Sequence, residues 1–206
     1  KEEKVLVLAA ESNDPDEVTN AFSNVLERCV TSPADFKVAD LALFDIEYLF
    51  LKTRAKSAGE KINVIATDPN DETFSVEHEI NIDRIGVEKN DDHTDLIEIA
   101  EGVSLKMRYP DISFFNEGVN TDSISNTVSL IARCVSQIVT EEEVIDRTEM
   151  TDSEVEEWLD ELTTEQFRKV SEFFTTMPKL KHTFTINNPN TGKDFTIVLE
   201  GLADFF

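Results

Sequence analysis

The chain has 206 residues, of which 40% are apolar, and a formal net charge of -24 at pH 7. A domain of roughly 150 residues buries about 70% of its unfolded surface, so this length supports one compact domain, and 14 Phe residues argue against disorder. The 43 Asp and Glu residues against 19 Lys and Arg repel phosphate backbones and anionic membranes, so we expect no nucleic-acid partner and no membrane partner.

Cysteine usage and the chain ends indicate a compartment. Cys29 and Cys134 stand without a CxxC motif, which suits a reducing cytoplasm, and both fall on apolar helix faces where we expect buried structural thiols. No apolar run approaches the ~18 residues of a membrane span, and no signal peptide is visible. The first residue is Lys1 rather than Met, so we expect further residues upstream.

The N-terminal quarter predicts two helices. The cap Asn13-Asp14 precedes apolar residues that recur at helical spacing as far as Cys29, which predicts the first helix. The second begins at Ser32-Pro33 and ends near Ala58, with Gly59 as its C-terminal cap. Its central part is apolar on nearly every side, so we expect it to be a buried central helix.

A β region follows the second helix. Ile62–Ala66 leads into the turn Asp68–Asp71, and apolar and polar residues then alternate over Phe74–Ile82. This pattern predicts a hairpin with one buried face. The acidic stretch Glu88–Asp92 is expected to be a mobile loop.

The middle of the chain predicts a second hairpin and a long helix. Leu96–Ile99 and Val103–Met107 form the hairpin, with Glu101-Gly102 as its turn. After Asn120 apolar residues recur at spacings of three and four as far as Ile138, which predicts one amphipathic helix.

Two capping-box motifs predict the start of the next two helices. Thr151 with Glu154 opens the first, Thr163 with Gln166 opens the second, and Pro178 ends the second. Each box is framed by apolar residues placed as a hydrophobic staple. The two helices should form a helical corner.

The C-terminal segment predicts a last hairpin, in which Thr183–Asn187 and Phe195–Leu199 flank the turn Asn188–Gly192. Its Pro-Asn turn is similar to the earlier turn Asp68–Asp71. Either a repeated hairpin module or common turn chemistry explains the similarity. The elements together predict an α+β fold in which antiparallel β-hairpins pack on a bundle of amphipathic helices.

No catalytic, cofactor or metal site is recognisable. His78, His93 and His182 lie far apart, and the six glycines form no phosphate-binding loop. The spacing of acidic residues over Asp68–Glu79 imitates a calcium loop, but Thr73 stands where a sharp turn needs Gly. We therefore expect a chain that is not an enzyme and that has no cofactor and no metal.

The acidic maximum allows two interpretations. Over Glu141–Glu161 eleven carboxylates accompany Arg147 alone. Such a face could imitate the phosphates of nucleic acid, or it could be the outer side of a packed helix, because Val155 and its apolar neighbours are in helical register. An acidic interaction protein that mimics nucleic acid or sequesters a basic partner is therefore the alternative function.

The densest group of cations lies in Glu47–Glu60. Lys52 and Lys56 share one side of the predicted helix, while Arg54 points the opposite way. Cations in the last turns of a helix stabilise it by ~0.3–1 kcal/mol each through the helix dipole. A local role and contact with an acidic partner both remain open for Lys52 and Lys56.

Three stretches, in their order along the chain, resemble the baseplate hub proteins of T-even-like contractile-tailed phages. The stretches are KEEKVLVLAAES, EYLFLKTRAKSAGE and FFTTMPKLKHTFTINNPNTGKDFTIVLEGLADFF. The resemblance covers nearly the whole chain and implies one baseplate-hub-like domain over residues 1–206.

The resemblance implies a non-enzymatic protein that is made late in infection in the host bacterial cytoplasm. It would act as a hub subunit or as a hub assembly factor (a chaperone of hub assembly), and could remain in the virion tail baseplate. The implied partners are other phage baseplate hub proteins, and self-association is left open. Family members carry an additional N-terminal segment that would precede Lys1.

Aromatic and Met anchors favour a protein interface in the C-terminal third. Trp158 and Phe174 are in helical register and are expected in the core, whereas Phe173 falls outside that stripe. The last two residues either close the core or anchor a partner. The hypothetical partner interface consists of Phe173, Met177, Phe205, Phe206, Lys52 and Lys56.

Overall fold

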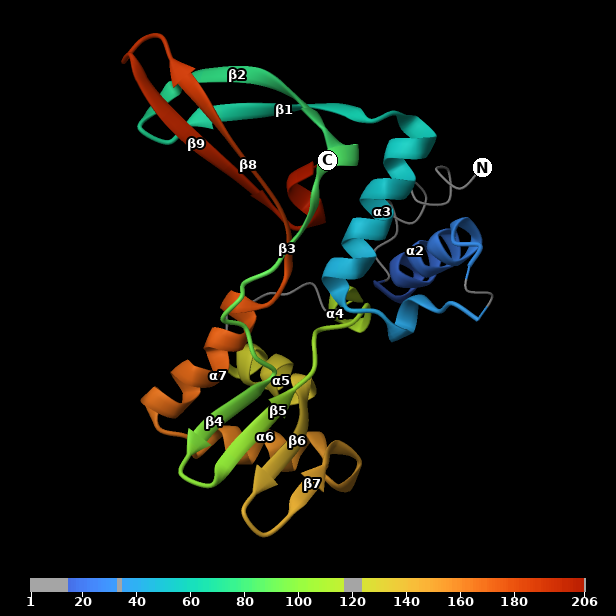
Figure 1. The fold of residues 1–206 in the computed structure, drawn as a ribbon, viewed down its shortest axis with the longest axis vertical. Helices are drawn as coiled ribbons and strands as arrows, with labels where there is room; N and C mark the ends of the chain where they lie inside the picture. Colours follow the sequence, from blue (N-terminus) through green and yellow to red (C-terminus); the bar gives the residue numbers. More distant parts are fainter. Residues whose placement is uncertain (1–14, 33–34, 117–123, 206) are drawn as a thin grey trace. The chain divides into compact units, whose positions relative to one another are not determined.

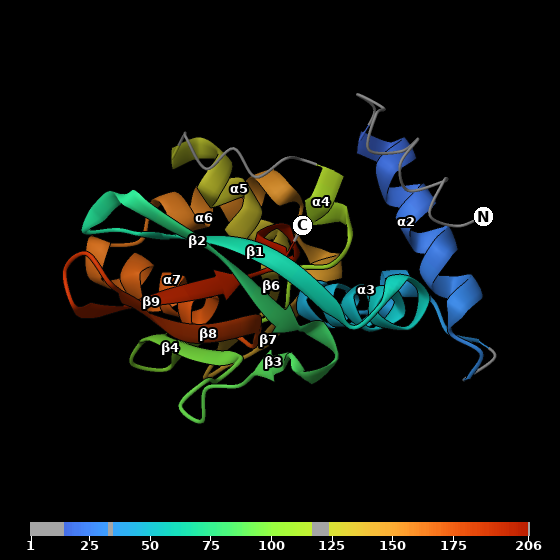
Figure 2. The same cartoon turned by 90° about the horizontal axis from the view of Figure 1, so that it is seen from above.

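The computed structural model describes residues 15–32, 35–116 and 124–205. The chain divides into two compact units: Lys1–Ser23 with Lys89–Met177, which we call the sheet unit, and Asn24–Glu88 with Pro178–Phe206, which we call the hairpin unit. Helices accompany antiparallel sheets in both Figure 1 and Figure 2, which confirms the predicted α+β fold. That residues 1–206 act as a single domain stays a prediction.

Helix α2 (Pro15–Cys29) confirms the first predicted helix, while the expected cap Asn13-Asp14 lies outside the described residues. Val25 and Leu26 are buried. Cys29 is exposed, so the expectation of a buried thiol is wrong for this residue. The reason is its position at the last residue of the helix, beyond the turn that faces the core.

Helix α3 (Leu43–Ala58) begins later than the predicted start at Ser32-Pro33, which is therefore wrong. A 3₁₀ turn at Val38–Asp40 precedes the helix instead. Val38 is fully buried there, and its N–H donates to Glu27 Oε1 at 3.1 Å. This tertiary contact holds the chain in a turn that local propensity does not reveal.

The C-terminal end of α3 is where the sequence predicts it. Gly59 caps the helix with φ 115°, a region that residues with a side chain rarely adopt. The expectation of burial on nearly every side agrees with the structure over residues 43–55, where no residue is exposed and Ile46 is buried on the side opposite Phe44 and Leu51. The buried side chains of α3 are Phe44, Ile46, Leu51 and Ala55.

Two long hairpins form most of the hairpin unit (Figure 1), and both were predicted. Strand β1 (Lys61–Asp68) pairs with β2 (Asp71–Asn81). Strand β8 (Lys179–Asn188) pairs with β9 (Lys193–Glu200).

A short strand, β3 (Gly86–Glu88), was not predicted. It pairs antiparallel with β8, placing Gly86 opposite Lys181 and Glu88 opposite Lys179. The expected loop Glu88–Asp92 therefore begins only after the strand. Because β3 and β8 come from the two chain segments of the hairpin unit, their pairing joins those segments.

The core of the hairpin unit draws on α3, both hairpins and the C-terminal 3₁₀ turn Leu202–Phe205. Rings from opposite hairpins stack where they meet, with His78 and Phe184 centroids 4.4 Å apart. An isolated hairpin is marginal in water, so each hairpin depends on the other for a partner surface. The buried residues of this core are Leu51, Ala55, Ile80, Ile82, Ile85, Leu180, Leu199 and Phe205.

The two hairpin turns are joined by a buried hydrogen bond. Asn188 Nδ2 donates to Asp68 Oδ2 at 2.8 Å, and the two residues are 0% and 3% exposed. Asp68 Oδ1 accepts the N–H of Asn70, and Asn188 Oδ1 accepts the N–H of Asn190, both at 2.9 Å. The two turns thus begin with the same side-chain hydrogen bond, but two residues separate β1 from β2 and four separate β8 from β9. A repeated module and common turn chemistry both stay interpretations of the similarity.

The sheet unit contains four antiparallel strands in the order β4-β5-β6-β7. They are β4 (Leu96–Ala100), β5 (Val103–Met107), β6 (Val135–Thr140) and β7 (Val144–Asp146). The β4–β5 hairpin confirms the prediction, and β7 was not predicted. Gly102 turns this hairpin with φ 72°.

Helices pack against one face of this sheet and share its core. They are α5 (Ile124–Cys134), α6 (Asp152–Asp160) and α7 (Thr164–Thr176), and a short α4 (Ser113–Asn116) precedes them. The buried core residues are Ile97, Ile99, Leu105, Met107, Phe114, Val128, Ile131, Ala132, Cys134, Val135, Ile138, Val155, Leu159, Val170 and Phe173.

The predicted helix from Asn120 to Ile138 is wrong in its second half. Helix α5 ends at Cys134 and strand β6 starts at the next residue, Val135. Val135 and Ile138 are both buried, at a helix-like spacing of three, because the register with β5 shifts between Lys106 and Met107. This irregularity in the strand lets two residues three apart point to the same buried face, which is the spacing that a helix would also show.

Both predicted capping boxes are present. The Thr163 hydroxyl accepts the N–H of Gln166 at 3.4 Å, and Gln166 Oε1 accepts the N–H of Thr163 at 2.9 Å. Thr151 and Glu154 make the same pair of bonds at the start of α6. These local bonds fix both helix starts before any tertiary contact is needed.

The Asp68–Asn188 bond should make stability pH-dependent. The Asn188 side chain and the Asn70 N–H hold the pKa of Asp68 below its usual value. The stabilisation is then present above the unfolded pKa and lost as pH falls through the folded one. Urea midpoints measured between about pH 5 and about pH 2 should therefore fall less steeply in Asp68→Asn than in the wild type.

Asp91→Asn, in the loop after β3, is the matched control and should keep the wild-type slope. Equal slopes for all three proteins would show that the buried bond contributes nothing to acid sensitivity.

The two cysteines should differ in reactivity. Burial raises the pKa of Cys134 to about 12, so at pH 8 only about one thiol in ten thousand is ionised. Cys29 is exposed. Iodoacetamide followed by mass spectrometry should label Cys29 in the native protein and Cys134 only in urea; rapid native labelling of Cys134 would contradict its burial.

Candidate functional site

The aromatic anchors predicted for an interface lie mostly inside the protein. Phe173 and Phe205 are each 2% exposed, in the cores of the sheet unit and the hairpin unit. Met177 is half-buried at the C-terminal cap of α7. Phe206 lies outside the described residues. The interface role of these residues stays a prediction.

Phe173 replaces Phe174 as the central aromatic residue of α7, so the expected stripe is wrong on this point. The Phe173 ring lies 5.5 Å from Tyr109 and 5.1 Å from His93. Phe174 is half-buried and meets Phe173 edge-on. Which of the two rings enters the core depends on how α7 is rotated about its axis against the sheet. The helical spacing of the apolar residues is compatible with burial of either ring.

His93 belongs to the same aromatic cluster. Its Nδ1 lies 2.9 Å from the Thr176 hydroxyl, and burial lowers its pKa. His78 is stacked on Phe184, and His182 lies in β8. The Phe184 ring also contacts His182, with the centroids 5.9 Å apart, so the expectation that the histidines lie far apart is wrong for His78 and His182. Packing between hairpins that are distant in sequence brings these two together, while His93 belongs to the sheet unit.

Lys52 and Lys56 are held by contacts within the hairpin unit. The Lys52 ammonium donates to the Asp83 carbonyl and lies 5.1 Å from the Tyr48 ring centroid. Lys56 lies 3.0 Å from Glu60 and 3.3 Å from the Asp83 carboxylate. The hydrogen bond to Glu60, and then the one to Asp83, raise the pKa of Lys56.

Asp83 thus brings the two lysines together. Helical periodicity could find the pair on α3 but not this distant acceptor. Surface ion pairs of this kind contribute at most about 1 kcal/mol, so the local contacts leave Lys56, which is exposed, able to meet a partner.

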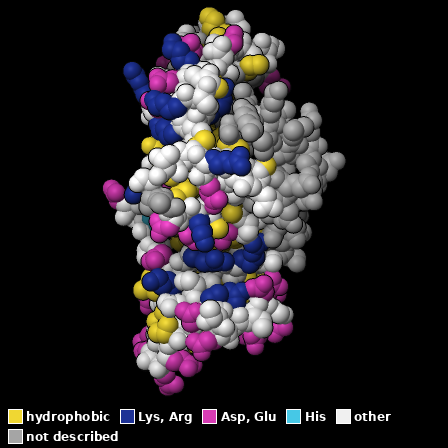
Figure 3. Space-filling view, turned by 90° about the vertical axis from the view of Figure 1, so that its right-hand side faces the viewer, with side chains coloured by type: hydrophobic (Ala, Val, Ile, Leu, Met, Phe, Trp, Pro, Cys, Tyr) yellow, Lys and Arg dark blue, Asp and Glu magenta, His cyan; other side chains and the backbone are white. Residues whose placement is uncertain are grey.

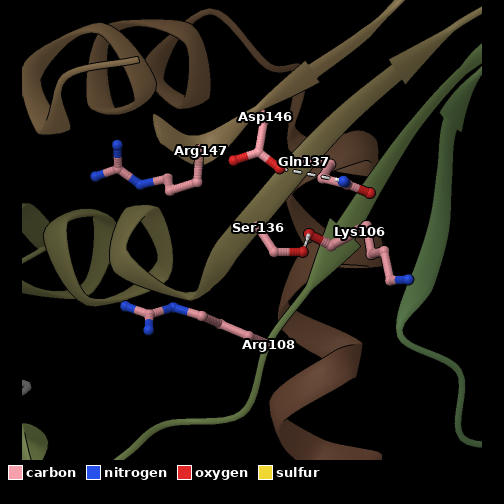
Figure 4. Close-up of a pocket in the computed structure, with 6 residues that line it drawn as sticks. All are labelled: Lys106, Arg108, Ser136, Gln137, Asp146 and Arg147. Carbon is pink, nitrogen blue, oxygen red and sulfur yellow. Dashed lines mark hydrogen bonds between the residues drawn. The ribbon is translucent and has the colours of Figure 1, made fainter. Parts of the chain in front are cut away.

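A hollow of about 520 Å³ opens on the sheet unit, on the face of the sheet opposite the helices. Sequence reasoning missed it, because its residues come from β5, β6, β7 and the residues that directly follow β5 and β7. In Figure 4 Arg108 and Arg147 lie at the left of the hollow and Lys106 lies at its right, with Ser136 and Gln137 between them on the same face of the sheet. We call it the basic hollow; its lining residues are Lys106, Arg108, Ser136, Gln137, Asp146 and Arg147.

Strand register places the polar side chains of the basic hollow in one row. Lys106 is opposite Gln137, and Gln137 is opposite Asp146. Gln137 Nε2 donates to Asp146 Oδ2 at 3.3 Å. The Thr148 backbone N–H lowers the pKa of Asp146, which keeps this carboxylate ionised.

Backbone carbonyls orient both arginines of the hollow. Arg108 Nε donates to the carbonyl of Arg133 at 2.8 Å, and Arg147 donates to that of Met150 at 2.6 Å. Arg147 also pairs with Asp152. Both guanidinium groups are therefore held in place before any ligand arrives.

The acidic maximum is the solvent side of packed elements. Among its residues Val155 and Leu159 are buried in the core of the sheet unit, whereas Glu141, Glu142 and Glu143 are exposed. The face drawn in Figure 3 shows a row of Lys and Arg side chains in its lower part, with Asp and Glu side chains crowded below it. Cations and carboxylates nevertheless meet in surface ion pairs of this unit, such as Arg147 with Asp152.

The described residues contain no group of three or more His, Cys, Asp or Glu that could hold a metal ion. Asp68, the first residue of the calcium-like spacing, is buried against Asn188 instead. Nor does the described part of the chain contain a helix that is both long enough and apolar enough to cross a membrane.

A family model described as T4 bacteriophage base plate protein matches residues 1–206. The chain belongs to this family of phage baseplate proteins. Comparison with curated proteins and with solved structures found no match. Because the match runs from the first residue to the last, both units of this baseplate protein lie within the family's sequence.

Membership makes the chain a structural protein of the phage tail baseplate, with other baseplate proteins as its partners and the virion tail as its location. The absence of enzymatic activity stays a prediction. The family match agrees with the resemblance found in the three stretches of sequence at the level of the baseplate.

The burial of Phe173 predicts a large stability effect in this baseplate protein. Phe173→Ala should lower the free energy of unfolding by about 3–5 kcal/mol, because truncation leaves a cavity among packed rings. Phe174→Ala, which removes a half-buried ring from the next residue, should cost clearly less. Urea unfolding followed by circular dichroism measures both.

A Phe173→Ala protein as stable as the wild type would mean that the ring is not a core residue in solution. Its predicted role as a partner anchor would then regain support.

Proposed function

We propose that this baseplate protein acts in the central hub of the baseplate, as a hub subunit or as a hub assembly factor, through protein–protein contacts. The observation that carries the proposal is the family match over residues 1–206, which makes the whole chain a baseplate protein. The resemblance of three ordered stretches to hub proteins supports the hub as its place. Assembly would take place in the host cytoplasm.

We further propose that both units serve as one functional domain over residues 1–206. Each unit has its own buried core, and the C-terminal Phe205 completes the core of the hairpin unit. A chain that lacked the C-terminal segment would therefore lose a hairpin and a core residue together. This dependence supports the proposal that the whole chain acts as one functional domain.

The surfaces available for contact differ between the units. The hairpin unit presents exposed Ile65, at 79%, and Val198, at 49%, on strands whose other outward residues are polar. Lys56 is exposed on α3. Apolar residues on an otherwise polar strand face suit contact with a protein. Lys52 and Lys56 on α3 stay a separate, polar candidate for such a contact.

The acidic alternative rests on a separate observation, the exposed glutamates at residues 141–143 and the carboxylates that follow them. Binding through such a face should weaken steeply as salt rises. A hub contact centred on apolar residues should not, so ionic strength separates the two functions.

Co-expression with the hub proteins of the same phage, followed by size exclusion with light scattering, tests the proposal. We expect a stoichiometric complex that persists at high salt. The variant Ile65→Ser should weaken it and Lys52→Gln/Lys56→Gln should weaken it less, because rim charges contribute mainly to the association rate.

Ile65→Ser is suitable because a 79% exposed side chain adds little to folding, whereas deletion of Phe205 would disturb the core. Elution of the wild-type chain alone at every salt concentration would rule out a stable hub subunit. A complex that dissociates at high salt would favour the acidic alternative.

A further inference from the structure

Strand β1 offers an open edge without charge, in a chain of which 30% is charged. It hydrogen-bonds to β2 and to no other described strand, and Figure 1 shows the two as a ribbon of their own. Residues 62–67, between Lys61 and Asp68, are all uncharged. In an antiparallel pair every second residue directs its N–H and C=O away from its partner, so β1 can pair with a further strand along this edge.

The side chains of β1 leave apolar surface uncovered on both faces of the ribbon. Ile65 is 79% exposed on the outward face, and its neighbours there, Asn63 and Thr67, are exposed as well. On the inward face Ile62 and Val64 pack on the core of the hairpin unit and yet are only half-buried. A strand added beside β1 would cover apolar side chains on both faces at once.

The other edge strands are protected by charge, by short length or by the chain that follows them. Strand β2 presents Glu77 and Glu79 on its outward face, and β3, β4 and β7 contain five residues or fewer. At the end of β9 the N–H of Glu200 donates to Asp204, in the C-terminal 3₁₀ turn. Charge on an edge strand prevents unwanted pairing, so its absence from β1 indicates an edge that is kept for pairing.

The sequence of β1 is complementary to itself. A two-fold axis at Val64 lays a second copy of β1 antiparallel beside the first, so that Val64 meets its own counterpart. Ile62 is then opposite Ala66 on the inward face, and Lys61 is opposite Thr67 on the outward face. The pairing covers residues 61–67 and ends where the register with β2 shifts. Apolar residues therefore meet apolar residues, and no two like charges are opposite each other.

The same arrangement also separates β1 from β9. Ile65 lies diagonal to Ile65 of the second copy on the outward face, a separation that large side chains span. Two copies of β9 turned about Ile197 would instead place Asp194 directly opposite Glu200, where the carboxylates repel each other. Self-pairing is therefore favourable for β1 and unfavourable for β9.

We propose that two copies of this protein pair antiparallel along β1, so that their ribbons form one continuous sheet in the order β2-β1-β1-β2. Such a contact is isologous, because the same edge serves both copies. One pair of strands is a small interface, so the dimer is reversible and depends on concentration. The inference goes beyond the hub proposal and does not rest on it, since the pairing needs no other phage protein.

Sedimentation velocity of the full chain alone, at concentrations from about 1 μM to about 500 μM, tests the inference. We expect the mass to rise with concentration from that of the 23.3 kDa chain to twice that value. Each copy has a net charge of -24, so repulsion between copies opposes pairing. The dimer should therefore become tighter as ionic strength rises from about 0.01 M to about 0.15 M, because salt screens that repulsion.

Ile65→Lys should weaken the dimer about tenfold, because it removes an apolar contact from both copies and brings two ammonium groups near each other. Its folding should be unchanged, as circular dichroism can verify, since this position is opposite Glu77 of β2 and the new charge faces a carboxylate. The matched control is Val198→Lys, which makes the same kind of change at an exposed position of β9, opposite Thr183. It should dimerise as the wild type does.

Two cysteine variants test the register of the pairing in a Cys29→Ser background, where Cys134 is buried. With oxidised glutathione, Val64→Cys should form a disulfide between two copies, because the two-fold axis brings this position within the Cα spacing of a disulfide. Thr67→Cys should not, because its counterpart lies about 20 Å away along the strands. Non-reducing gel electrophoresis measures both.

Several results would overturn the inference. They are the mass of one chain at every concentration and ionic strength, equal losses in Ile65→Lys and Val198→Lys, or cross-linking of Thr67→Cys without cross-linking of Val64→Cys. A monomer whose hub complex is lost in Ile65→Lys would also overturn it, and would mean that the edge takes a strand of another protein. A dimer that forms while no hub complex does would count against the proposed function alone.

Discussion

The pairing of β3 with β8 is the constraint on which the hairpin unit depends. Gly86–Glu88 and Lys179–Lys181 lie side by side, so residues 89–177 leave and re-enter the hairpin unit at adjacent points. Loop-closure entropy grows only with the logarithm of loop length, so a long insertion costs little more than a short one. The core that the two segments share, such as Leu51 with Leu180, offsets that cost.

The buried bond between Asp68 and Asn188 solves a second problem of a unit made from two segments. Apolar contacts between two hairpins tolerate sliding, because one β-branched side chain packs much like another. Asp68 and Asn188 are nearly inaccessible to water, so each needs the other as its hydrogen-bond partner. Displacement of either turn would leave a buried donor or acceptor without a partner. We interpret the bond as fixing the alignment of the hairpins.

The surface of the sheet unit carries both an acidic stretch and a small group of cations. Eleven carboxylates over Glu141–Glu161 repel anionic partners, while Lys106, Arg108 and Arg147 line a hollow of the same unit. A structural protein that meets several partners during assembly benefits from such contrast, because each face then rejects partners of its own sign. Membership in the baseplate family is consistent with contacts of this kind.

Local signals in the sequence determined the α+β class, three hairpins, both capping boxes and the end of α3 at Gly59, because turns and caps are made by residues close together in the chain. Tertiary structure decided the rest. A bulge against β5 converted the helical spacing of Val135 and Ile138 into a strand, and the rotation of α7 buried Phe173. The basic hollow could not be predicted, because only strand pairing brings Lys106, Gln137 and Asp146 into one row. Periodicity records which residues are apolar, whereas register and rotation depend on partners that lie far away in sequence.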